Sequence, residues 1–399
     1  MANTLNLGNG DWATKENSLL GYNSENGNYK PLPFDFTRAS NGTFVNKSGL
    51  IETAANGVPR IDFLGNTSGA LLLEPQRTNL ITYSSDYTDA SWNKVNSAGS
   101  TLPNVTSNYG ISPDGTQNAD RVQVSRASGA GDFSSVYKSI TTSNVNRAHS
   151  IWLKSLSGTP TILILNNNGV YVSQQITTEW VRYELDLGVG TVTEIQLSVV
   201  GSNFVANVSE SADFLAWGAQ LELGSYSTSL INTQGSAVTR VSDACSQTNI
   251  PTSVINSLYP FSMYVESANI GENRFALCFI NISSTSQYFV INMNNSEVQL
   301  DARSNGTSEL IQSGITINTG AKFKVAITME SATSGKICVN GNTVVSKTNF
   351  ASQIANSNIK DLLLGQLRVS GDTGDRLPIY DAKLYNTALT DAELQALTT

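Results

Sequence analysis

The sequence of this 399-residue chain predicts an all-β protein, in which an extended N-terminal segment precedes two antiparallel β-sandwiches. Three observations support this fold class. Nearly every segment contains short apolar runs between Gly-, Asn- and Ser-rich turns, two Asn-Gly pairs lie between apolar runs, and one segment has the signature of a helix. A chain of this length is long enough for two or three domains with their own hydrophobic cores.

The hairpin signals are the most specific local features. Residues 161–175 (TILILNNNGVYVSQQ) and residues 335–346 (GKICVNGNTVVS) each contain two apolar runs, separated by Asn168-Gly169 and by Asn340-Gly341. Asn-Gly tolerates the positive φ angles that a type I′ turn needs, so both segments are predicted to be hairpins. Residues 192–200 (VTEIQLSVV) partly alternate between apolar and polar, as a half-buried strand does.

One helix is predicted, close to the end of the sequence. Thr390 can cap its first turn, and Glu393 follows three residues later, which is the spacing of a capping box.

Composition divides the chain into three regions. Residues 1–80 are rich in Gly and Asn and have no obvious core of their own, so we expect an extended segment that docks onto something else. Residues 81–245 contain four of the five tryptophans and many short strands, which predicts a sandwich. Residues 250–399 form a second strand-rich block. The polar stretch near 243–252 contains a proline and is typical of a linker.

A charged corner lies where the first region ends. Glu74-Pro75-Gln76-Arg77 interrupts an apolar run, and Pro75 cannot donate to a sheet ladder. We expect Glu74 and Arg77 to stabilise this turn, either by pairing with each other or by bonding backbone groups.

Charge and motifs exclude several functional classes. Only 14% of the residues are charged and the formal net charge is −8, which disfavours nucleic acid and anionic membranes as partners but suits a neutral, hydroxylated ligand such as a glycan. No apolar run reaches transmembrane length, and the first residues lack the layout of a signal peptide. No phosphate-binding, dinucleotide-binding or zinc-protease motif is present, so no cofactor is expected.

The few residues that could carry redox or metal chemistry are isolated. Cys245, Cys278 and Cys338 match no metal motif, so they are either free buried thiols or one disulfide with a spare cysteine. His149 is the only histidine and lies beside a strand-like run, which predicts a structural role.

Two groups of short motifs stand out in the first two regions. The first group is FDFTRAS (34–40), GLIE (49–52), PRIDF (59–63) and LLLEPQRTNL (71–80), and the second is WGAQLELG (217–224), YSTS (226–229) and Thr239-Arg240. The first group resembles a signature of bacteriophage fibre and spike proteins, which in that family precedes a jelly-roll domain similar to carbohydrate-binding modules, and the second group matches the end of that domain. Residues 250–399 resemble a concanavalin A-like, laminin-G-type sandwich through YDAKLYN (380–386) and LTDAEL (389–394).

This resemblance covers nearly the whole chain and implies a non-enzymatic fibre or spike of the virion, on its head or its tail. Residues 1–80 would attach to other virion structural proteins after assembly in the host cytoplasm, and the sandwiches would bind a host surface polysaccharide. Trimers are common in this family, and several weak sugar sites gain avidity together, so we expect a homotrimer. Two alternatives stay open: a structural decoration or adaptor protein without glycan binding, and a glycan-degrading tailspike.

The candidate binding residues are aromatic, because sugars lay their C–H faces on aromatic rings. Trp92, Tyr137, Tyr171 and Trp180 lie in or beside predicted loops and strand edges of the jelly roll, and each could instead belong to the core or its rim.

Two further kinds of site have weaker signals. Asp372 and Asp375 flank a sharp turn, and the resemblance to laminin-G-like sandwiches allows calcium there, although calcium needs six to eight oxygen ligands. A glycosidase would need two carboxyl groups across a sugar. The acids available for such a pair are Glu179, Asp186, Glu194, Asp213 and Glu222, and none has a catalytic context, so no catalytic residue is predicted.

Overall fold

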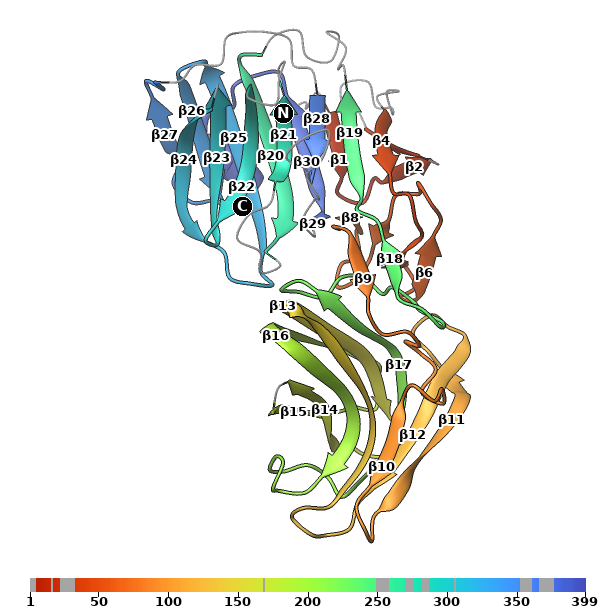
Figure 1. Ribbon diagram of the computed structural model, residues 1–399. Helices are drawn as coiled ribbons and strands as arrows, with labels where there is room; N and C mark the ends of the chain where they lie inside the picture. The colour runs from red at the N-terminus through yellow and green to blue at the C-terminus, as the bar shows by residue number, and fades with distance from the viewer. Residues whose placement is uncertain are drawn as a thin grey trace. The chain divides into compact units, whose positions relative to one another are not determined.

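The computed structural model describes residues 5–15, 17–21, 33–167, 169–248, 258–269, 276–281, 287–304, 306–351, 361–365 and 377–399. Its secondary structure is strand apart from one short helix in these ranges, and all strand pairs described are antiparallel, so the all-β prediction is confirmed. The chain forms two compact units (Figure 1). Unit 1 comprises residues 1–76 and 241–399, and unit 2 comprises residues 77–240.

Unit 1 is a sandwich of two sheets, which in its described part have six and nine strands. The first sheet has the order β1 (Leu5–Gly8), β30 (Asp381–Tyr385), β20 (Phe261–Ala268), β25 (Lys322–Ser331), β26 (Ser334–Val339) and β27 (Val345–Thr348). The second has the order β2 (Ala13–Lys15), β3 (Ser18–Leu20), β4 (Pro33–Thr37), β19 (Ala244–Thr248), β28 (Asp361–Leu364), β21 (Ala276–Asn281), β22 (Gln287–Asn294), β23 (Glu297–Ser304) and β24 (Thr307–Thr316). One hydrophobic core joins the two sheets.

Short strands complete unit 1. They are β5 (Gly42–Val45) with β6 (Ile51–Ala54), and β29 (Leu377–Ile379) with β8 (Ala70–Leu73) and β7 (Ile61–Asp62). Helix α1 (Asp391–Thr398) begins with the predicted capping box, in which the Thr390 amide donates to Glu393 Oε2 at 2.8 Å. The predicted turn after β26 is also confirmed. Asn340 and Gly341 have φ angles of 50° and 67°, and the Asn342 amide donates to the Val339 carbonyl at 3.0 Å.

The N-terminal residues do not form the separate segment that the composition suggested. Strand β1 pairs with β30 along its whole length, and β4 pairs with β19, so these residues extend both sheets of unit 1. The stretch expected to be a linker contains β19, which lies between β4 and β28 in its sheet, and Cys245, the second residue of this strand, is fully buried. The expected regions 1–80, 81–245 and 250–399 therefore differ from the units observed, because strand pairing joins distant parts of the chain.

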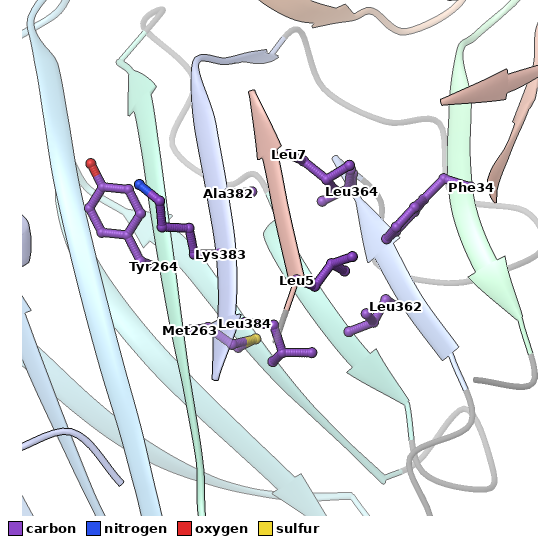
Figure 2. A pocket seen from close by; sticks show the side chains of 10 residues that line it. All are labelled: Leu5, Leu7, Phe34, Met263, Tyr264, Leu362, Leu364, Ala382, Lys383 and Leu384. Atoms are coloured by element: carbon purple, nitrogen blue, oxygen red, sulfur yellow. The ribbon is translucent and has the colours of Figure 1, made fainter. Parts of the chain in front are cut away.

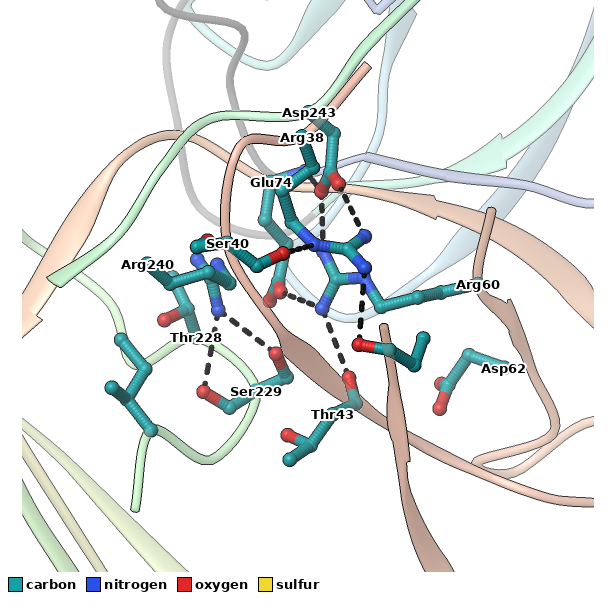
Figure 3. A network of polar contacts seen from close by, with 12 residues as sticks. Arg38, Ser40, Thr43, Arg60, Asp62, Glu74, Thr228, Ser229, Arg240 and Asp243 are labelled. Carbon is teal, nitrogen blue, oxygen red and sulfur yellow. Dashed lines mark hydrogen bonds and ion pairs between the residues drawn. The ribbon is translucent and has the colours of Figure 1, made fainter. Parts of the chain in front are cut away.

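A buried ionic network lies where residues 33–76 meet the start of β19 (Figure 3). Asp243 accepts from Arg38 at 3.0 Å and from Arg60, while Glu74 accepts from Arg60 at 2.7 Å. All four side chains are fully buried. Burial acts to lower the pKa of Arg60, but the carboxylates of Asp243 and Glu74 outweigh it and raise that pKa. Glu74, at the predicted corner, thus pairs with Arg60. The sequence had led us to expect that Glu74 and Arg77 would pair with each other or bond backbone groups.

The cavity between the sheets of unit 1 is a packing defect (Figure 2). Its volume is about 20 Å³, and Leu5, Leu7, Phe34, Leu362 and Leu364 are among its lining residues. A site of this size could hold one water molecule, but a water needs polar partners. The polar side chains among its lining residues are Tyr264 and Lys383, and their polar ends point away from the leucines in Figure 2. It is not a ligand site.

Unit 2 is a sandwich built around two long, strongly curved strands, β13 (Phe133–Ser155) and β16 (Val181–Val200) (Figure 1). Its other strands are β9 (Arg77–Asn79), β10 (Asn93–Asn96), β11 (Thr101–Ile111), β12 (Gln117–Ser125), β14 (Thr161–Asn167), β15 (Val170–Gln175), β17 (Ser211–Leu223) and β18 (Val238–Arg240). Strands β14 and β15 form the first predicted hairpin, with Asn167 opposite Val170. Asn168 of its turn lies outside the described residues.

The long strands take part in both layers of unit 2. The first half of β13 pairs with β10 and with the second half of β16, which in turn pairs with β14. The second half of β13 pairs with β17 and with the first half of β16, and β17 continues to β12 and β11. The side chains between these layers form a second hydrophobic core, separate from that of unit 1.

Candidate functional site

A cleft of about 260 Å³ lies on the outer face of the layer β10–β13–β16–β14–β15. The cleft forms because side chains along each strand point alternately into the core and outward. On β16, Ile195, Leu197 and Val199 point into the core, so Glu194 and Gln196 point outward. The remaining lining residues described are Val95, Phe133, Ser135, Tyr137, Leu163, Asn166, Tyr171, Val200 and Phe204.

A chain of hydrogen bonds orients the polar side chains along the cleft. Glu194 Oε2 accepts from Asn166 Nδ2 at 2.8 Å and from Gln196 Nε2 at 3.1 Å. Ser198 Oγ donates to Gln196 Oε1 at 3.3 Å and lies 2.5 Å from Ser135 Oγ. Each amide is thereby held in one orientation, which prepares these groups to meet the hydroxyls of a ligand.

Aromatic rings form the apolar part of the cleft. The Phe204 ring packs edge-on against Phe133, with 6.1 Å between centroids, and against Tyr171, with 5.8 Å. Tyr137 lies opposite Gln196 on β13. All four rings are half-buried, so part of each stays open to the solvent. No hydrogen bond joins the hydroxyl of Tyr137 or Tyr171 to another residue in the described ranges, which leaves both available to a ligand.

The structure brings together two of the four predicted aromatic residues. Tyr137 and Tyr171 line the cleft. Trp92 does not, because its side chain is only 1% exposed, its ring centroid lies 4.7 Å from that of Tyr87, and its Nε1 donates to the Tyr83 carbonyl at 2.9 Å. It is a core residue and offers no face to a sugar. Trp180 is half-buried outside the cleft, and its Nε1 donates to the Ile111 carbonyl at 3.0 Å.

The residues that sequence reasoning missed are Phe133, Phe204, Asn166 and Gln196. A usable signal existed for one of them, because the alternation in residues 192–200 places Glu194, Gln196 and Ser198 on one side of a strand. Phe204 follows β16 in an irregular segment, where no periodicity indicates which way a side chain points.

The acids considered for a glycosidase pair do not converge. Glu194 is the only carboxylic acid among the described residues of the cleft. Asp213 pairs with Arg121 on the other layer, and Glu222 is fully buried, where it accepts from the Thr228 amide at 2.9 Å. Glu179 and Asp186 are exposed and do not line the cleft.

A second depression lies on the outer face of β11, β12 and β17. Its volume is about 480 Å³, and Asn104, Gln123 and Asp213 line it in a hydrogen-bonded row. No aromatic side chain is among its described lining residues. It therefore lacks the platform that a sugar ring would stack on.

The metal and thiol predictions have partial outcomes. Asp372 and Asp375 lie outside the described residues, and within the described ranges no three acidic, histidine or cysteine side chains gather as a metal site would require. Cys245 and Cys338 are free and buried. In the described part of the chain, no helix has the length and apolar character needed to cross a membrane.

The comparison with protein families concerns unit 1. Residues 243–395 match the concanavalin A-like lectin/glucanases superfamily. The similarity expected for residues 250–399 is thereby confirmed. The description names lectins and glucanases together, so it indicates the fold without deciding between binding and hydrolysis. No curated protein matches the chain at a significant level.

Solved structures with a similar fold match less than half of this chain. A sialidase CBM40 module from Ruminococcus gnavus, bound to α2,3-sialyllactose, is 16% identical over 37% of this chain and 85% of its own, with a TM-score of 0.32. A mutant of NanB sialidase from Streptococcus pneumoniae is 20% identical over 39% of this chain and 26% of its own, with a TM-score of 0.32. A heptameric pentraxin from Limulus polyphemus is 11% identical over 36% and 71%, with a TM-score of 0.29. Similarity at this level says nothing about the ligand of this chain.

Proposed function

We propose that this chain is a non-enzymatic carbohydrate-binding protein and that the cleft of unit 2 holds the glycan. The observation that carries this proposal is the combination of half-exposed aromatic rings with a fixed row of amide, hydroxyl and carboxylate groups on one sheet face. Rings suit the C–H faces of sugars, and the polar row suits their hydroxyls. Among the described lining residues the cleft has one carboxylate, Glu194, whereas hydrolysis needs two, so we propose binding without hydrolysis.

A glycan array probed with the full-length protein tests this proposal. Tyr171→Ala removes a ring of the cleft and is expected to weaken binding roughly tenfold or more. Tyr109→Ala is the matched control, because Tyr109 is 47% exposed in the same unit and lies over Arg121 outside the cleft. Equal losses in both variants, or no loss in Tyr171→Ala, would contradict the site. Release of reducing ends from a bound glycan would contradict the non-enzymatic part.

We propose further that the protein is a fibre or spike of a bacteriophage virion that binds host surface polysaccharide. The motifs at residues 34–40, 59–63 and 71–80 support this role by resemblance. Residues 1–80 would contact other virion proteins, and three copies would act together for avidity. Mass spectrometry of purified particles and light scattering of the full-length protein test these points. A stable monomer at micromolar concentration would contradict the homotrimer.

A further inference from the structure

The described lining residues of the cleft of unit 2 include a negative charge and no positive charge. Glu194 is the only charged side chain among its described lining residues. Both hydrogen bonds to this carboxylate arrive at Oε2, from Asn166 and Gln196. Within the described residues, Oε1 has no protein donor. One oriented carboxylate oxygen is thus left to accept a hydrogen bond from a ligand.

Two lysines on the strands that form the cleft, Lys138 and Lys94, make their hydrogen bonds outside it. Lys138 alternates with Tyr137 and is buried on the opposite face, where its Nζ donates to Thr82 Oγ1 at 2.8 Å and to Ser91 Oγ at 2.7 Å. Lys94 Nζ donates to backbone carbonyls, including that of Trp92 at 3.2 Å. None of the described lining residues can therefore neutralise an anionic ligand.

Arg147 is also withdrawn from the cleft. Its guanidinium donates to Thr193 Oγ1 at 2.5 Å and to Asn167 Oδ1 at 2.7 Å, and the side chain is fully buried. Thr193 and Asn167 are the strand neighbours of Glu194 and Asn166, so they point to the opposite face of the layer. The arginine therefore serves the interior of the sandwich.

We propose that Glu194 makes this cleft selective for neutral and amino sugars and excludes uronic and sialic acids. The inference rests on the proposed function of the cleft. The free carboxylate oxygen accepts from sugar hydroxyls or pairs with an amino group, and both arrangements satisfy it. A carboxylate on the ligand would instead bring a like charge within several ångströms, without a counter-ion in the lining. In a partly solvated site, that repulsion weakens binding by roughly 10- to 100-fold.

The test compares the wild-type protein with Glu194→Gln on an array that pairs each acidic glycan with its carboxyl-reduced counterpart. The substitution keeps the shape of the side chain and an oxygen for Asn166 and Gln196, but it removes the charge. The wild type is expected to bind the reduced member of a pair at least tenfold more tightly. Glu194→Gln should bring the two members within about threefold. Glu184→Gln is the control, because Glu184 lies on the same strand outside the cleft and pairs with Arg182.

The possible outcomes separate the two proposals. A wild-type preference for the acidic member, or an unchanged ratio in Glu194→Gln, overturns the selectivity while leaving a glycan site in place. Binding that Tyr171→Ala does not weaken, or an absence of any bound glycan, overturns the proposed function and the selectivity with it. A reduced ratio in Glu184→Gln as large as that in Glu194→Gln shows an effect of overall charge and also overturns the selectivity.

Discussion

Asp243 holds two guanidinium groups in the interior of unit 1. It accepts from Arg38 and Arg60, and its Oδ2 also accepts from the Glu74 amide at 2.8 Å. The network pairs the buried guanidinium groups of Arg38 and Arg60 with the buried carboxylates of Asp243 and Glu74. Replacing only one partner is costly, because it leaves a buried charge without compensation.

Asp243→Asn is therefore expected to lower the free energy of unfolding of unit 1 by about 3–5 kcal/mol. Urea unfolding measures this loss. Glu330→Gln is the control, because Glu330 pairs with Lys336 at the surface and its side chain is 39% exposed. An exposed pair contributes at most about 1 kcal/mol. A loss of that small size in Asp243→Asn would show that the network does not stabilise the fold.

Because His149 is buried, we expect unit 2 to lose stability in acid. Its Nδ1 donates to the Gln220 carbonyl at 3.0 Å, and burial, the largest cause, lowers its pKa from 6.5 to about 4. The unfolded chain therefore binds a proton at a higher pH than the folded unit. The contribution to stability is complete above about pH 6.5 and is lost as the pH falls toward 4, by up to roughly 3 kcal/mol.

Because His149 is the only histidine, its ring resonances report this titration without overlap. Urea unfolding at pH 7 and pH 4.5 measures the associated loss of stability, and His149→Gln should flatten the profile between these values. A folded-state titration near pH 6.5 would contradict the expectation.

Single residues also show where sequence reasoning stops. Trp92 lies among polar residues in the sequence and Tyr171 lies between two valines, yet the ring of Trp92 packs into the core and that of Tyr171 is partly exposed to solvent. The difference arises from tertiary contacts, since Tyr83 and Tyr87 cover Trp92. His149 was expected to be structural, and an apolar strand beside it was sufficient grounds for that prediction.

At the scale of elements, local signals predicted local structures. The Asn340-Gly341 turn and helix α1 were predictable because backbone sterics and capping act over a few residues. The pairing of β1 with β30 could not be predicted, because the two strands lie at opposite ends of the chain and no pattern in either sequence identifies its partner.

The capping box of α1 yields a prediction at this scale. Thr390→Ala removes the side chain that accepts from the Glu393 amide, so it should cost about 1 kcal/mol. In a unit of this size that loss lowers the melting temperature by about 2–4 °C. Thr390→Ser keeps the hydroxyl and should retain most of the stability in calorimetry. Equal losses in the two variants would contradict a capping role.

At the scale of the whole molecule, the two hydrophobic cores predict two unfolding transitions. A glycan bound in the cleft stabilises only the folded form of unit 2. At a concentration 100 times its dissociation constant, it adds about 2.7 kcal/mol to that unit. Calorimetry should show one transition moving to higher temperature, and Tyr171→Ala should abolish this shift. A single transition, or equal movement of both, would contradict independent units.

The fold class was predictable from the sequence, but the division of the chain was not. Residues 1–80 lack an apolar core of their own, and this observation was correct, yet the partner that buries Phe34 and Phe36 is the remainder of the same chain. The polar composition of β19 resembled a linker because several of its side chains are only half-buried, although Cys245 is buried. The homotrimer and the virion location stay predictions.

Unit 2 is an insertion within unit 1, and its first and last strands, β9 and β18, pair with each other, with Arg77 opposite Arg240. This arrangement has a consequence on the ribosome. Synthesis proceeds at about 5–20 residues per second, so residues 1–76 wait on the order of 10–30 s while the insertion is made. During this time Phe34, Phe36 and Leu71 lack the strands that will cover them. Unit 2, for which we propose carbohydrate binding, is therefore complete on the nascent chain before the strands of unit 1 can all pair.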